Sequence, residues 1–279
     1  MAKRSEDASI SAEVIRNLPW WFIAIVLLGV YFVFLVFTNK LYGDVFAFLK
    51  DGVLTTIQIT VTAYAFSITI GMFTGLALVS KNRLIYNIAT FYVQVIRGIP
   101  ILVIILYIAF AGVPLVVSGI NLIGTTLSDM GILGVENIFV ALQNRDISLL
   151  YRGVIALAIS YGAFSAEIFR AGIQSIGHGQ MEAAQSLGMS YIQAMRHIIL
   201  PQAIRRVLPP LGNDLIAMLK ESSLISALGV REITQMGKLY SAKSFEYLAT
   251  YNVVAILYLT MTVLLSLGVR AMEKRFRIN

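Results

Sequence analysis

The chain has 279 residues, of which 58% are hydrophobic and 13% are charged, and its mean hydropathy of +0.79 favours one polytopic membrane protein over one or two soluble domains. It contains no cysteine, which excludes disulfide bonds, thiolate metal sites and a cysteine nucleophile. In a membrane protein, the net charge of +7 indicates orientation and not nucleic-acid binding.

An all-α fold with about six membrane spans is predicted from apolar runs long enough to cross a bilayer. The first run, residues 20–37, follows a polar tail at 1–19 and begins with two tryptophans suited to the headgroup level. We interpret it as a retained helix and not as a signal peptide, because no small-residue cleavage site follows it. A short charged loop up to residue 50 is expected next, with Lys40, Asp44 and Lys50.

The other expected spans contain two glycine or proline features. Gly71 and Gly75 are spaced to let a neighbouring helix approach closely, and we favour a packing role over a transport role for them. Gly98 and Pro100 weaken a helix and predict a kink or break. The remaining spans are expected at 53–79, 84–110, 153–173, 207–228 and 250–269.

Two segments outside these spans are expected to lack regular membrane helices. Residues 111–151 are predicted to be irregular and folded onto the membrane surface, because no part of them reaches about 18 uninterrupted apolar residues. A second polar loop is expected from the end of the fifth span to about residue 249. A charged tail at 271–279 then ends the chain.

Lysine and arginine are distributed unevenly between the two sides. Thirteen of the 22 lie in the N-terminal tail, the 81–83 turn, the polar island at 170–206 and the C-terminal end, whereas the alternate loops hold seven. The positive-inside rule therefore places both termini and the polar island in the cytoplasm.

The polar island contains a helix-prone stretch between two apolar runs. Gly188 can adopt φ > 0 and end a first short helix, with Glu182 expected near its start. Ser190 and Gln193 fit a capping box for a second helix, which Pro201 is expected to close. A rigid bent element of this kind is suited to contact a cytosolic partner.

This stretch resembles the cytoplasmic EAA loop of ABC importer permeases. The family pattern is E-A-A, three residues, Gly, nine residues and I-x-L-P, and every fixed position matches in register. The flanking sequences resemble the polar amino acid branch, and the resemblance covers roughly residues 52–270. The matching residues are Glu182, Ala183, Ala184, Gly188, Ile198, Leu200 and Pro201.

The resemblance implies a multi-pass permease of the bacterial inner membrane. A five-helix type I importer core would occupy 51–270, preceded by an extra helix and loop at 20–50. Two permease subunits, identical or related, would form the path. Two ATP-binding subunits would dock on the 182–201 loop, and an extracytoplasmic binding protein would deliver a polar amino acid.

The same resemblance implies that this chain is a transport subunit and not an enzyme. ATP and Mg²⁺ would bind to the partner subunits, and no phosphate-binding G-x-x-x-x-G-K-[ST] loop occurs here. No metal site is expected, since His178 and His197 lack the H-E-x-x-H spacing.

Charged and polar residues within the spans form a candidate substrate pathway. Charges at the bilayer centre are costly unless they are paired or hydrated. Glu167 and Arg170 share a helix face and can pair, although snorkelling to the interface is an alternative. In the resembling branch a glutamate often precedes Arg97 by three residues, but here that residue is Gln94, which leaves the partner of Arg97 open. The candidate pathway consists of Arg97, Glu167, Arg170, Asn213, Lys220 and Glu221.

Two other classes of function remain open at this point. An ion-coupled secondary amino acid transporter would work without an ATPase, and Glu167 is the obvious acid for its ion site. A membrane-embedded amino acid sensor would share the docking loop but move no substrate.

Overall fold

A computed structural model describes residues 20–132, 134 and 137–276, and in this part of the chain the regular elements are all helical. The predicted all-α fold is therefore confirmed, while the tails at 1–19 and 277–279 lie outside the described residues. Four described helices are long and apolar enough to cross a membrane, and Ile23–Thr38 is a shorter apolar helix. The four are Lys40–Ala77, Ile101–Asp129, Leu149–Gln174 and Tyr247–Lys274.

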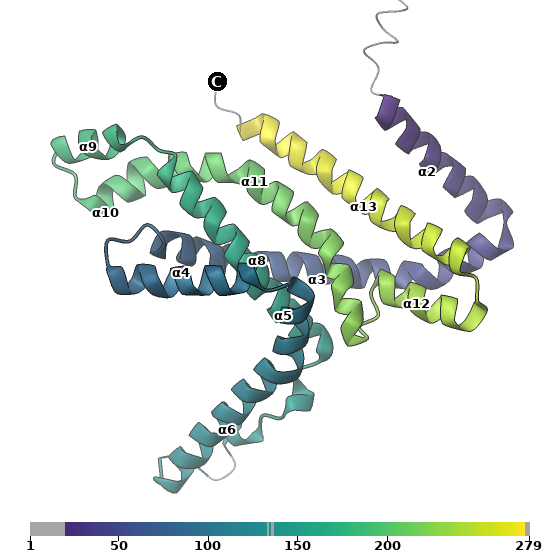
Figure 1. Ribbon diagram of the computed structural model, residues 1–279, viewed down its shortest axis with the longest axis horizontal. Coiled ribbons are helices and arrows are strands. Elements are labelled where there is room, and N and C mark those ends of the chain that lie inside the picture. The colour runs from purple at the N-terminus through teal and green to yellow at the C-terminus, as the bar shows by residue number, and fades with distance from the viewer. Residues whose placement is uncertain (1–19, 133, 135–136, 277–279) are drawn as a thin grey trace, which may run out of the picture.

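The loop expected before residue 51 is helical instead. α3 (Lys40–Ala77) follows α2 (Trp20–Thr38) almost directly, and the side chain of Asn39 accepts the Leu41 N–H to cap it. Val45 and Leu49 are fully buried in a cluster shared with α12 (Ile233–Ser244) and α13 (Tyr247–Phe276), and α2 lies beside α13 (Figure 1). This packing explains why the charged first turns of α3 are helical. The expected domain boundary at residue 51 thus falls inside one continuous helix.

The third expected span is interrupted at Gly98–Pro100, as predicted from these two residues. α4 (Arg83–Gly98) ends, Ile99 is extended as residues before proline tend to be, and Pro100 precedes α5 (Ile101–Tyr107). The expectation of an irregular segment from residue 111 is wrong. α5 continues through a π-helical turn, η1 (Ile108–Gly112), into α6 (Val113–Asp129).

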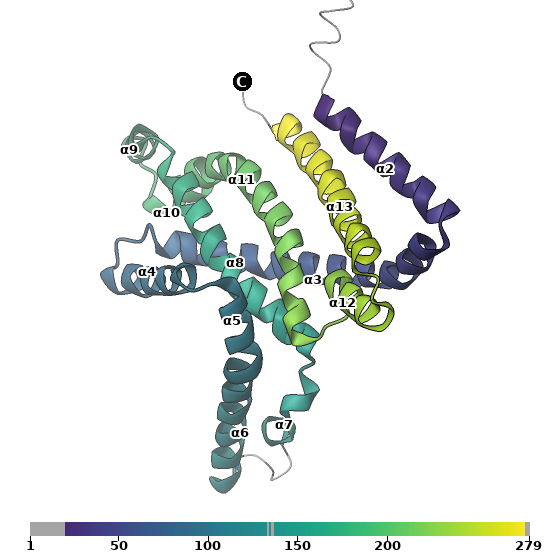
Figure 2. The same ribbon diagram turned by 45° about the vertical axis from the view of Figure 1, so that its right-hand side comes forward.

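The continuation was missed because residues 111–151 were judged by themselves and contain no 18 uninterrupted apolar residues, whereas the helix begins earlier, at Ile101. Pro114 lies just after the π-helical turn η1 inside this continuous helix, where the regular i→i−4 hydrogen bonds are already interrupted. α6 extends away from the other long helices and returns through α7 (Ile138–Ala141) and η2 (Asn144–Asp146) (Figure 2). The guanidinium of Arg152 ties this return to the bundle by donating to carbonyl oxygens of Ala109, Ile147 and Asn144.

α3 crosses α8 (Leu149–Gln174) at the centre of the bundle (Figure 1). A Cβ atom added to Gly71 would lie 2.5 Å from Ser165 Cβ, and one added to Gly75 would lie 2.6 Å from Phe169 Cβ. The two backbones can approach this closely only because both positions are glycine. The packing role predicted for the glycine pair is therefore confirmed.

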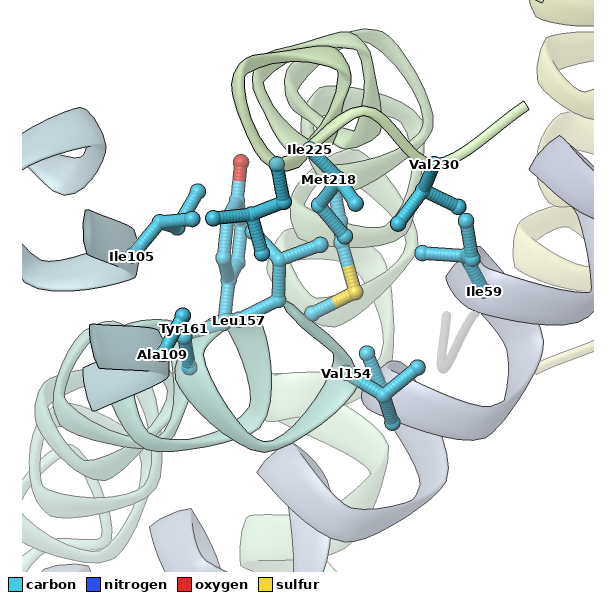
Figure 3. Packing of buried hydrophobic residues seen from close by; sticks show 12 residues of the cluster. Ile59, Ile105, Ala109, Val154, Leu157, Tyr161, Met218, Ile225 and Val230 are labelled. Atoms are coloured by element: carbon cyan, nitrogen blue, oxygen red, sulfur yellow. The ribbon is translucent and has the colours of Figure 1, made fainter. Parts of the chain in front are cut away.

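A hydrophobic cluster beside this crossing joins α3, α5 and α8 to α11 (Leu200–Glu221) and the 3-10 turn η4 (Ser222–Leu228) (Figure 3). Ile59, Ile105, Leu157, Met218 and Ile225 are fully buried in it. The cluster fixes the end of α11 against the middle of α8. The helix at the fifth expected span starts earlier than predicted, at Leu200, and ends in 3-10 helix, and it is not among the four candidate spans.

The second polar loop contains a helix, α12, that was expected to be irregular. Glu232 is fully buried and caps it, accepting hydrogen bonds from Thr234 N at 2.9 Å, Gln235 N at 2.7 Å and the Tyr258 hydroxyl at 2.7 Å. Burial raises the pKa of the Glu232 carboxyl group, an effect that these hydrogen bonds oppose. A capping carboxylate on a polar stretch was the available sequence signal for this helix.

Candidate functional site

The polar island folds into a bent element at one end of the bundle, formed by α9 (His178–Ser186), α10 (Tyr191–Ala194) and the π-turn η3 (Met195–Ile199) (Figure 1). We call it the coupling element. Gly188 has φ = 81° and follows the end of α9, as predicted. Its N–H bonds to Gln185 O at 2.9 Å, and Met189 N bonds to Ala184 O at 3.1 Å. This pair of bonds is the Schellman arrangement, which favours glycine at the left-handed position.

The capping box of the second helix is also confirmed. Gln193 N donates to Ser190 Oγ at 3.3 Å, and Ser190 N donates to Gln193 Oε1 at 2.8 Å. Two details of the expected element are wrong. α9 begins at His178, so Glu182 lies in its second turn and not near its start. Pro201 does not close the second helix, because the helix continues without a break from α10 through the π-turn η3 into α11, and Pro201 lies just after that π-turn.

The residues of the EAA pattern divide into an inner and an outer set. Ala184 is buried, and Ile198 and Leu200 pack against a cluster that anchors the element to the ends of α8 and α11. On the outer surface, Leu187 is 82% exposed and Ile192 is 75% exposed. The exposed residues of the pattern are Glu182, Ala183, Gly188 and Pro201. An apolar outer face on an anchored element is typical of a surface that binds another protein.

A group of charged side chains joins the break in the third span to α8. Glu167 Oε2 accepts a hydrogen bond from Arg170 Nε at 2.8 Å, which confirms the predicted pair. Glu167 Oε1 also lies 3.5 Å from Arg97 Nη1, which forms a salt bridge. The Arg97 guanidinium is 5.7 Å from the centre of the Phe164 ring. The charge partner of Arg97, which the sequence left open because residue 94 is glutamine, is therefore Glu167 on a different helix.

α11 carries polar residues on two faces that differ in exposure. Asn213 and Lys220 are exposed on one face, whereas Asp214 and Glu221 are partly buried on another. Ser165 Oγ bonds to Asp214 Oδ2 at 3.3 Å. Glu221 has one buried carboxylate oxygen without a hydrogen-bond partner.

Two tyrosines lie beside the partly buried carboxylates of Asp214 and Glu221, and we call these four residues with Ser165 the inward polar surface. Sequence reasoning missed both tyrosines. The Tyr64 hydroxyl donates to Leu211 O, and Tyr161 lies close enough to interact with the Glu221 carboxylate. Hydroxyl groups inside otherwise apolar spans were the signal available for them. The carboxylates and hydroxyls here can bind cationic and hydrogen-bonding groups.

Three comparisons place the chain among known proteins. A family model described as binding-protein-dependent transport system inner membrane component matches residues 67–278. GlnM of Bacillus subtilis (strain 168), assigned to a glutamine ABC transporter, is 35% identical over 232 residues, which are 83% of this chain and 94% of GlnM. The glutamine transport system permease protein GlnP of Escherichia coli (strain K12) is 33% identical over 230 residues, covering 82% of this chain and 93% of GlnP. The crystal structure of an amino acid ABC transporter with histidines contains a chain that is 35% identical to this one in sequence. The two folds match with a TM-score of 0.66, over 82% of this chain and 94% of that chain.

Proposed function

We infer the function of this chain from the family to which it belongs, the inner membrane components of binding-protein-dependent transport systems. The chain is the permease subunit of an ABC importer of the polar amino acid type. It is a transport subunit and not an enzyme. The matches to whole permeases, over more than nine-tenths of their length, favour this reading over a secondary transporter or a sensor.

We propose that its substrate is glutamine or a closely related polar amino acid. The names of GlnM and GlnP support this choice. We further propose that the substrate passes beside the polar residues contributed by α3, α4, α8 and α11. These are the predicted Arg97, Glu167, Arg170, Asn213, Lys220 and Glu221, to which we add Tyr64, Tyr161 and Asp214.

The anchored coupling element is the observation that carries the proposed mechanism. Two ATP-binding subunits dock on its outer face, which exposes Leu187 and Ile192 beside Glu182. The inner face is packed on the ends of α8 and α11, the helices that bear Glu167 and Glu221. Closure of the ATPase dimer therefore rotates helices that line the proposed path, and the path opens alternately to the two sides. ATP and Mg²⁺ stay on those partners.

The proposed assembly lies in the bacterial inner membrane with both termini in the cytoplasm. It contains a second permease subunit, identical or related, and receives substrate from an extracytoplasmic binding protein. Lysine and arginine counts support this orientation, because thirteen of the 22 lie on the proposed cytoplasmic side.

Reporter fusions test the orientation. Fusions after Lys81 and Gln193 should report the cytoplasm, since Lys81 lies in the α3–α4 turn and Gln193 lies in α10 of the coupling element. Fusions after Asp44, Glu136 and Lys243 should report the outside. A cytoplasmic signal after Glu136 would contradict the orientation of α6 and its neighbours.

Reconstitution tests the transport reaction. Proteoliposomes that contain the permease, its ATPase subunits and the binding protein should accumulate labelled glutamine only when ATP is supplied. Omission of the ATPase should reduce uptake to the level of empty vesicles, because the chain has no phosphate-binding loop of its own. Uptake driven by an ion gradient without ATPase would indicate a secondary transporter, and binding without uptake would indicate a sensor.

A further inference from the structure

A hollow of about 810 Å³ opens between the α3–α4 turn and the coupling element. One wall is the turn itself, with Lys81, and the other is formed by the start of α10 and by η3, with Tyr191 and Arg196. Lys81 Nζ lies 5.9 Å from the centre of the Tyr191 ring, so a cation–π contact joins the two walls. A second hollow of about 650 Å³ shares Lys81 and Tyr191 and is lined by Glu182 as well.

The larger hollow combines an apolar lining with a cationic rim. Leu76, Val79, Met195 and Leu200 supply hydrocarbon surface. Among the described residues that line it, the charged ones are both cations, Lys81 and Arg196, and both are exposed. Neither forms a salt bridge with a described carboxylate. The hollow therefore fits a ligand with an anionic head and an apolar tail.

The position of the hollow identifies the source of such a ligand. The turn lies directly between α3, a candidate membrane span, and α4, so the hollow is at the level where membrane helices end. In the orientation proposed above, on which this step rests, that level is the cytoplasmic leaflet. Anionic phospholipids concentrate there and are attracted to basic clusters beside membrane helices.

We propose that this hollow binds an anionic phospholipid, with the phosphate held by Lys81 and Arg196 and an acyl chain along the apolar lining. The lipid bridges the α3–α4 turn and the coupling element. Its occupancy therefore stiffens the element against the bundle, and transport driven by the ATPase depends on anionic lipid.

Direct lipid binding tests the proposal without relying on transport. Labelled phosphatidylglycerol is titrated against the detergent-purified complex of permease and ATPase, with phosphatidylcholine as the neutral competitor. The double variant K81Q/R196Q should bind phosphatidylglycerol about 30-fold more weakly, because each surface cation contributes about a fivefold factor. The control K274Q removes a lysine from the last turns of α13, outside the hollow, and should bind like the wild type.

Uptake in proteoliposomes gives the functional readout. Added phosphatidylglycerol should stimulate wild type and K274Q but not K81Q/R196Q. Unchanged lipid binding by the double variant would overturn the proposal, even if the proposed transport reaction itself failed. Loss of the ATPase from the double variant in pure phosphatidylcholine would also overturn it, since the hollow would then belong to the ATPase docking surface.

Discussion

The variant Gly71→Leu is expected to unfold at a lower temperature than the wild type. Its Cβ alone would lie 2.5 Å from Ser165 Cβ and 3.0 Å from Ala166 N, so the larger side chain forces α3 and α8 apart. Overpacking of this kind costs about 3 kcal/mol. Leucine is better than glycine in a helix by about 1 kcal/mol, which only partly offsets that cost. The separation would also break the contact between Ser165 and Asp214 on the inward polar surface.

Thermal unfolding in detergent, followed by size-exclusion chromatography, measures this effect. A net loss of about 2 kcal/mol corresponds to a fall in the apparent melting temperature of roughly 4–8 °C. Gly29→Leu is the matched control, because it makes the same substitution within α2 where no atom lies within 4 Å of the added Cβ. Gly29→Leu should melt at or slightly above the wild-type temperature. Equal melting of Gly71→Leu and the wild type would mean that α3 and α8 do not cross this closely.

The turn and caps of the coupling element could be predicted from the sequence because they depend on short-range interactions. Gly188 ends α9 and the Ser190–Gln193 box starts α10, because both depend on residues within a few positions along the chain. The same holds for the break at Ile99–Pro100 and for the Glu167–Arg170 pair. These features involve backbone angles, caps and i,i+3 contacts, which need no knowledge of the tertiary fold.

Elements that depend on distant contacts were the ones that sequence reasoning misjudged. The first turns of α3 are helical because Val45 and Leu49 pack on α12 and α13, nearly two hundred residues away. Arg97 forms a salt bridge with Glu167 on another helix, and no spacing along the sequence predicts that pair. The inward position of Asp214 and Glu221 follows from how α11 docks on α8, which the sequence alone does not specify. Periodicity and composition describe one helix at a time.

Both candidate sites involve α8 and α11, and this gives a physical route between them. The coupling element is packed on the last turns of α8 and the first turns of α11, and the inward polar residues lie further along them. A movement of the element therefore need not pass through a flexible linker to reach the proposed path. The rigidity of the turn at Gly188 then decides how much of the movement is transmitted.

We expect Gly188→Val to separate ATP hydrolysis from transport. At φ = 81° a β-branched residue is strained, and the left-handed region costs an L-residue about 1–2 kcal/mol. Because nothing lies within 4 Å of the added Cβ, the substitution creates no clash, and its effect comes from the backbone alone. A penalty of about 1.4 kcal/mol lowers the equilibrium constant for the native turn about tenfold, so uptake should fall by up to that factor.

Asparagine at the same position provides the matched control. It tolerates the left-handed conformation better than other residues with a Cβ, so Gly188→Asn should retain at least half of the wild-type uptake. The measurements are co-purification with the ATPase, ATP hydrolysis and glutamine uptake in proteoliposomes. A related loss of uptake is expected for Glu182→Lys, because it reverses the charge on the exposed face of α9 without changing the turn.

The comparison of the two Gly188 variants decides the role of the turn. If Gly188→Val and Gly188→Asn transport equally well, the left-handed turn does not transmit the movement, and the coupling must run through α8 and α11 by another contact.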